Sequence, residues 1–161
     1  MILKNIFHLL FNMMTLYWIG PIVEKYFGKI KFLFIYFLSA ISGALLTIGL
    51  NMNLRFATVG ASSAIFGLLG AIIYFAYNYK DRITATLLKQ MTIIVIINLI
   101  FGFFQPNVDN FGHLGGLLGG IVTAMLLGTN KKRNIIEMLS SLVVFIGLYL
   151  ILIYLGLFMV K

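Results

Sequence analysis

The chain has 161 residues, of which 61% are hydrophobic and only 10% are charged. Soluble domains are roughly half apolar and a quarter charged, so this composition excludes an ordinary soluble domain and indicates an integral membrane protein. The formal net charge of +8 does not indicate nucleic-acid binding, because the Lys and Arg residues stand in short clusters between apolar runs. The lack of cysteine excludes disulfides, thiolate metal ligands and a cysteine nucleophile.

Apolar runs divide the chain into segments of membrane-spanning length. A bilayer core about 30 Å thick is crossed by roughly 20 helical residues. Runs of that order cover residues 5–22, 32–50, 60–79, 90–104, 111–128 and 135–160. They are apolar on all sides, whereas barrel strands would be short segments of alternating polarity. We therefore expect an all-α, polytopic membrane protein with six transmembrane helices.

Basic residues between these runs indicate the orientation of the helices. Most of them fall in three alternate connections: Lys25, Lys29, Lys31, Lys80, Arg82, Lys89, Lys131, Lys132 and Arg133. The other two connections carry only Arg55. By the positive-inside rule, the first set faces the cytoplasm, so the first, third and fifth helices begin at the outer face.

Three polar residues then share one depth below the outer face. His8, Ser62 and His113 each lie a few residues into a helix of the same direction, within about one turn of one another in height. Asn12 follows His8 by one turn and lies on the same face. The chain contains no other histidine. Ionisable groups inside a bilayer are costly and mark function by default, so this layer is the candidate site.

Serine and histidine at one depth suit nucleophilic catalysis. A serine hydroxyl attacks when a base accepts its proton and donors stabilise the resulting oxyanion. Ser62 and His113 supply a candidate dyad, and His8 and Asn12 supply donors. Ser62 also lies near a helix N-terminus, which favours negative charge. The competing interpretation is structural, because a lone serine in a membrane helix usually bonds to the carbonyl one turn back.

The third and fifth helices are rich in small residues. Gly60 and Gly67 stand on the third helix, and Gly116 and Gly120 stand on the fifth. Small residues at such spacings let membrane helices approach to backbone contact. We expect these glycines to bring Ser62 and His113 close together.

Four motifs in this order resemble those of the rhomboid intramembrane serine proteases. The sequence His8-Leu9-Leu10-Phe11-Asn12 is similar to the family's H-x-x-x-N, and Gly60-Ala61-Ser62-Ser63 is similar to its G-x-S-x. His113, Gly116 and Gly120 match H-x-x-G-x-x-x-G, and Gly20, Glu24 and Gly28 fit G-x-x-x-E-x-x-x-G. The resemblance covers about residues 5–128.

The resemblance implies a role for each site residue. Ser62 is then the nucleophile and His113 the general base, while His8, Asn12 and the Ser62 backbone N–H form the oxyanion hole. The implied activity is intramembrane proteolysis of single-span membrane proteins, cut near the outer face, by a multi-pass hydrolase of the bacterial cell membrane. Its partners are these transmembrane substrates and the lipid bilayer, with no nucleic acid, cofactor or metal.

The resemblance also implies a domain organisation. Residues 1–130 correspond to a rhomboid-like catalytic core made of the family's second to sixth helices, and residues 131–161 to an additional C-terminal transmembrane helix. On this interpretation the chain is N-terminally truncated, lacking the family's first transmembrane helix and the loop that follows it.

Two positions depart from the family pattern near the serine. Ser63 replaces a glycine that often follows the nucleophile, and it should still pack. Phe66 stands where some members have tyrosine, so it is expected to stack on His113 without a hydrogen bond.

Other functions stay open at this point. One alternative is a catalytically inactive rhomboid-like protein that binds membrane helices, or an inactive truncated fragment. A His8–His113 metal site lacks a third ligand, since only Asp109 is acidic on the outer side. A transporter would be expected to show internal repeats or broken mid-membrane helices, which the sequence lacks.

Overall fold

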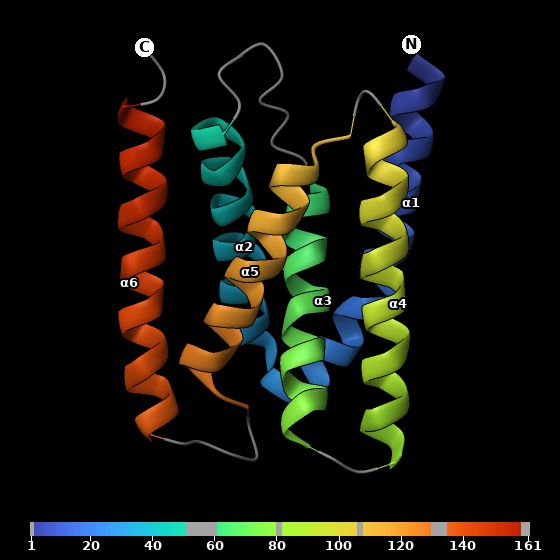
Figure 1. Ribbon diagram of the computed structural model, residues 1–161. Coiled ribbons are helices and arrows are strands. Elements are labelled where there is room, and N and C mark those ends of the chain that lie inside the picture. The colour runs from blue at the N-terminus through green and yellow to red at the C-terminus, as the bar shows by residue number, and fades with distance from the viewer. Residues whose placement is uncertain (1, 51–60, 80–81, 106–107, 130–134, 159–161) are drawn as a thin grey trace.

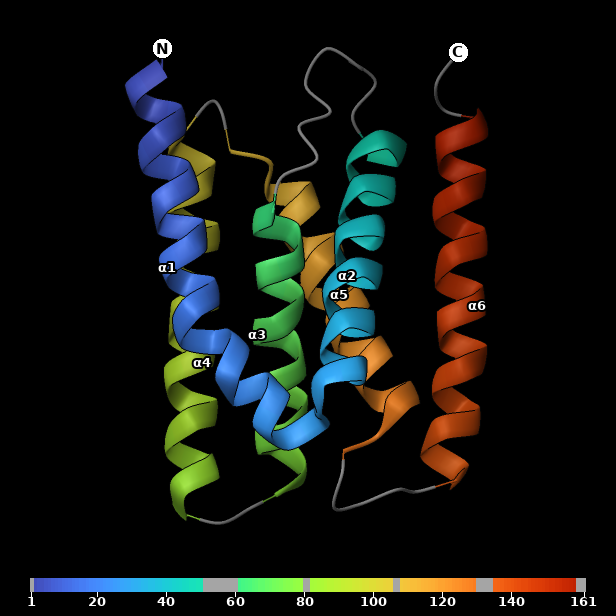
Figure 2. The same ribbon diagram turned by 180° about the vertical axis from the view of Figure 1, so that it is seen from behind.

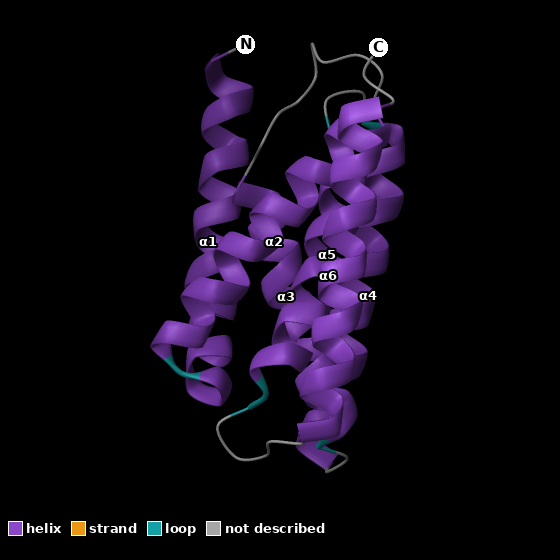
Figure 3. Ribbon diagram, turned by 90° about the vertical axis from the view of Figure 1, so that its left-hand side faces the viewer, coloured by secondary structure: helices purple, strands orange, loops and turns teal. Residues whose placement is uncertain are grey.

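The computed structural model describes residues 2–50, 61–79, 82–105, 108–129 and 135–158. Within these ranges it contains six helices and no strand (Figure 3). The helices are α1 (Ile2–Phe27), α2 (Lys29–Leu50), α3 (Ala61–Asn78), α4 (Arg82–Phe104), α5 (Asn110–Leu127) and α6 (Ile135–Phe158). Four of them, α2 to α5, are long and apolar enough to cross a membrane. The expected all-α, polytopic membrane fold is therefore confirmed, and each predicted run overlaps one helix.

The six helices form a bundle in which successive helices run in opposite directions (Figure 1). Helices α1, α3 and α5 begin at one end of the bundle, which we call the site end. Helices α2, α4 and α6 begin at the other end, which we call the basic end (Figure 2). Helix α3 is the most buried of the four spanning helices, while α4 is mostly exposed to the surroundings, as a lipid-facing helix would be.

The helix boundaries at the basic end differ from the expected ones. Only Gly28 separates α1 from α2, so Lys25 and Lys29 lie in helices and not in a loop. Gly28 has a φ of 88°, a left-handed conformation that glycine adopts without strain, and its N–H bonds to the Glu24 carbonyl at 2.8 Å. Helix α4 begins at Arg82, eight residues before the predicted start at residue 90. Basic side chains extend such helices, because their aliphatic stems cover apolar surface while the charge reaches water.

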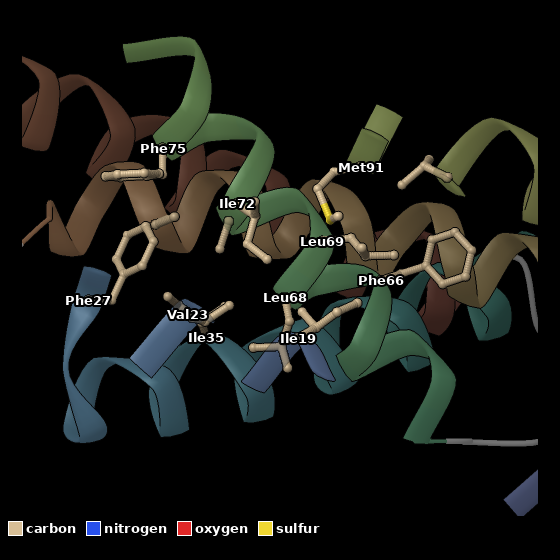
Figure 4. Close-up of a cluster of buried hydrophobic side chains, with 13 residues drawn as sticks. Ile19, Val23, Phe27, Ile35, Phe66, Leu68, Leu69, Ile72, Phe75 and Met91 are labelled. Atoms are coloured by element: carbon tan, nitrogen blue, oxygen red, sulfur yellow. The ribbon is translucent and has the colours of Figure 1, made fainter. Parts of the chain in front are cut away.

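A hydrophobic cluster surrounds α3 (Figure 4). Helix α1 contributes Ile19, Val23 and Phe27, which are spaced by four residues and so share one face. The other members are Ile35, Phe66, Leu68, Leu69, Ala71, Ile72, Phe75, Met91, Val95 and Ala124. Before Ile19, no described side chain of α1 is fully buried. Helix α1 is thus held to the bundle by its second half.

Helix α1 changes direction along its length, and its second part turns toward α2 (Figure 2). Pro21 lies inside this helix. Proline has no N–H to donate, and its ring conflicts with the carbonyl four residues earlier, which bends a helix. The bend separates the exposed first part of α1 from the second part, whose Val23 and Phe27 are buried in the hydrophobic cluster.

Helix α5 lies against α3 at backbone distance, because the contact points are glycines. A Cβ atom on Gly116 would overlap the Ser63 backbone, and one on Gly120 would overlap the Gly67 backbone. On its other side α5 packs closely on α2, where a Cβ on Gly119 would overlap the Ser42 side chain. No larger residue fits these positions unless the helices separate.

Polar contacts tie α2 to α5 and to α6. Lys31 of α2 donates from Nζ to the carbonyl of Gly128, at 2.9 Å, just past the end of α5. A cation at this place also suits the negative end of the helix dipole. Tyr149 of α6 donates from its hydroxyl to the Leu38 carbonyl of α2 at 2.9 Å, and the Ser42 hydroxyl lies 2.8 Å from the same phenol oxygen.

We predict that Gly120→Val destabilises the protein by about 2 to 3 kcal/mol, because the new side chain meets the Gly67 backbone, which cannot rotate away. Denaturant titration of the protein in detergent micelles measures this loss. Gly147→Val in α6 is the matched control, since a Cβ at Gly147 meets nothing within 4 Å. Equal losses in the two variants would contradict the role of Gly120.

Candidate active site

Two adjacent serines at the start of α3 have different environments. Ser63 is buried between α2 and α5, so that a Cβ on Gly43 would lie 2.6 Å from the Ser63 Cβ. Ser62 is the second residue of α3 and is only half-buried. Backbone N–H groups in the first turn of a helix have no partner within the helix. Ser62 is therefore the accessible hydroxyl, and it lies beside donors that suit an anion.

His113 lies in the first turn of α5 and is buried, with 8% of its surface exposed. Its ring stacks on Phe66 of α3, with the ring centroids 4.2 Å apart and the planes at 7°. This confirms the stacking expected from the sequence. Phe66 follows Ser62 by four residues, so both project from one face of α3. The His113 ring consequently lies against the α3 face that carries Ser62.

Asp109 fixes the start of α5, immediately before His113. Its Oδ1 accepts from the Gly112 N–H at 2.8 Å, which makes Asp109 the N-cap. Its Oδ2 lies 2.5 Å from the Thr47 hydroxyl of α2, and the carbonyl of Gly43 lies 3.0 Å from the same hydroxyl. A hydroxyl has one proton to donate, and a carboxylate is a stronger acceptor than a backbone carbonyl. The Thr47 hydroxyl therefore donates to Asp109, which is also the nearer of the two. Asp109 thus joins the first turn of α5 to α2.

Sequence reasoning considered Asp109 only as a metal ligand and did not consider Thr47. The signal for the cap was present, because Asp directly before a predicted helix is a preferred N-cap residue. Its partner was not predictable in this way, since Thr47 lies 62 residues earlier on another helix.

The predicted site residues on α1, and the one just before α3, are described less completely. Gly60 lies outside the described residues, and of His8 only the helical backbone is described. Asn12 is half-buried, one turn further along α1, between the exposed Phe11 and Met13. Among the described side chains, which exclude that of His8, no three His, Cys, Asp or Glu residues lie together as metal ligands. The α3–α5 part of the predicted site is packed, whereas the α1 part belongs to a largely exposed half-helix.

The sequence matches a known protein family over most of its length. A family model described as the Rhomboid domain matches residues 2–130. The chain is 39% identical over 153 residues to Rhomboid protease GluP of Bacillus subtilis. The aligned region covers 95% of this chain and 30% of that protein.

Two further relatives are similar at comparable identity. RHOMBOID-like protein 1 of Arabidopsis thaliana is 38% identical over 122 residues, covering 73% of this chain and 30% of the relative. Rhomboid-like protease 1 of Toxoplasma gondii is 35% identical over 136 residues, covering 81% of this chain and 45% of the relative. The chain spans less than half the length of each of these three relatives. Since the family model covers most of the chain, this multi-pass membrane protein belongs to the rhomboid family.

Proposed function

We propose that this protein is an intramembrane serine endopeptidase that cleaves single-span membrane proteins near the outer face with a Ser62–His113 dyad. The observation that carries the proposal is the stacking of His113 on Phe66, on the α3 face that also carries Ser62. Family membership supports the reaction class, since one of the compared relatives is named a rhomboid protease and another a rhomboid-like protease.

The proposed reaction uses His113 first as a base and then as an acid. His113 accepts the hydroxyl proton while the Ser62 oxygen attacks the carbonyl carbon of the scissile bond. The tetrahedral oxyanion accepts hydrogen bonds from the Ser62 backbone N–H and from His8 and Asn12. His113 then gives its proton to the leaving amine, and the C–N bond breaks. Water, deprotonated by His113, hydrolyses the acyl-enzyme and restores Ser62.

The surroundings of His113 suit this double role. Stacking on Phe66 holds the imidazole plane through a face contact. Phenylalanine has no hydroxyl and cannot compete for the transferred proton. The half-burial of Ser62 near the site end of the bundle keeps its hydroxyl within reach of water, which the second half of the reaction consumes.

We predict that Ser62→Ala and His113→Ala each reduce cleavage at least about a thousandfold, because each removes one member of a catalytic unit. The measurement is cleavage of a model single-span substrate by the natural full-length protein in liposomes. Ser63→Ala is the matched control, because Ser63 is the neighbouring serine and is buried in packing.

Two results would contradict the proposal. One is persistent cleavage by folded Ser62→Ala protein. The other is a folded wild-type protein that associates with the substrate and does not cleave it, which would support the alternative of an inactive, helix-binding relative.

Asp109 is proposed as a positioning residue for His113. We expect Asp109→Ala to reduce kcat by about tenfold or more with little change in KM, because the first turn of α5 loses its cap and its link to α2. Asp109→Asn, which keeps an N-cap side chain, should retain most of the activity and the pH profile of the wild type.

A double-mutant cycle with Thr47→Val tests the link itself. If Thr47 and Asp109 act through one hydrogen bond, the combined variant loses less activity than the two single losses predict. Independent, additive losses would show that the two residues do not act through this bond.

A further inference from the structure

A cleft of about 640 Å³ opens between the second half of α1 and the first half of α4. Helix α1 ends and α4 begins at the basic end, so the cleft lies away from Ser62 and His113 (Figure 1). Its apolar lining includes Pro21, Ile22, Ile83 and Leu87, and its basic residues are Lys25 and Arg82. None of the proposed catalytic residues lines the cleft.

Polar and apolar residues are ordered along both walls of this cleft. On α1 the charged Lys25 is nearer the helix end, and Ile22 is nearer the middle of the bundle. On α4 the charged Arg82 is the first residue, and Leu87 lies more than a turn further in. Thr86 uses its hydroxyl within α4, bonding to the Arg82 carbonyl at 3.1 Å. Both walls are thus basic at the membrane surface and apolar below it.

Among the described residues, neither Lys25 nor Arg82 forms an ion pair with a carboxylate. Glu24 carries the carboxylate that the structure describes at the basic end, and it lies 3.9 Å from Lys29 on the following helix. Lys25 instead lies over the ring of Tyr26, 5.5 Å from its centroid. Arg82 opens α4, where the positive end of the helix dipole adds to its charge.

We propose that this cleft binds an anionic phospholipid, with the headgroup phosphate between Lys25 and Arg82 and an acyl chain along Ile22 and Leu87. A free phosphate would use only the two cations, and a neutral lipid would use only the apolar wall. An anionic lipid satisfies both, and basic pockets between transmembrane helices at the membrane surface suit such headgroups. The bilayer around this multi-pass protein supplies the ligand.

Fluorescence quenching tests the proposal, because the chain has no cysteine and a single introduced one takes a unique label. Gln90, which is exposed and lines the cleft, is replaced by Cys and labelled with bimane in the full-length protein, in which it is kept as the only cysteine. The labelled protein is placed in phosphatidylcholine vesicles that contain brominated phosphatidylglycerol or, separately, brominated phosphatidylcholine. The ratio of the two quenching curves gives the relative affinity of the cleft for the anionic lipid.

We expect the cleft to prefer phosphatidylglycerol by more than about tenfold, since each basic side chain near the surface contributes roughly fivefold. Lys25→Gln and Arg82→Gln should each reduce the preference about fivefold, and Lys25→Arg should keep it. Lys89→Gln is the matched control, because Lys89 lies on α4 and does not line the cleft. Equal quenching by the two lipids in the wild type, or an equal loss in Lys89→Gln, would overturn the proposal.

A second arm separates a lipid from a soluble phosphate. Glycerophosphoglycerol, which has the same headgroup without acyl chains, is added at about 10 mM to the vesicles with brominated phosphatidylglycerol. The lipid proposal predicts that quenching is unchanged, because the soluble headgroup lacks the contact with Ile22 and Leu87. Relief of the quenching would show that the site binds phosphate groups and not lipid. Neither arm measures proteolysis, so the result is independent of the proposed enzymatic function.

Discussion

The close approach of α5 to α2 and α3 is the constraint on which the rest of the structure depends. In a bilayer the apolar surfaces of helices gain little by leaving lipid, so association relies on close packing and hydrogen bonds. Glycines supply that packing, since Gly116 and Gly120 meet the backbone of α3 and Gly119 meets Ser42 of α2. The stack of Phe66 on His113 is possible only at this separation. The chemistry proposed for Ser62 thus depends on residues that have no side chain.

The two ends of the bundle have different physical characters. At the site end, two of the described polar side chains contact neighbouring helices: the half-buried Asp109 bonds to α2, and the buried His113 stacks on α3. At the basic end, charged side chains such as Lys25 and Arg82 are exposed where helices begin or end. This separation follows from the energetics of a membrane, in which exposed charge is tolerated near the surface and buried polar groups need partners. The candidate protease site and the proposed lipid site therefore do not overlap.

Sequence reasoning predicted the fold because membrane helices obey a strong local rule. Without water to satisfy the backbone, an apolar run of sufficient length has to be helical. The helix ends near Lys25, Lys29 and Arg82 were less predictable, because long basic side chains permit a helix to continue beyond its apolar run. The contact of Phe66 with His113 was predictable, because Phe66 follows Ser62 by one helical turn and stands where some members of the family have tyrosine. The bond of Thr47 to Asp109 depends on the relative heights of two helices, which no local pattern encodes.

Helix α2 holds α5 at two points. Lys31, near the start of α2, bonds to the carbonyl of Gly128 past the end of α5, and Thr47, near the end of α2, bonds to the cap of α5. Between Lys31 and Thr47 the helix rises roughly 24 Å. A slide of α5 by a single residue would break both bonds at once. The length of α2 between these two residues therefore sets the depth of the His113 imidazole in the bilayer, and with it the level at which a substrate peptide bond would have to stand.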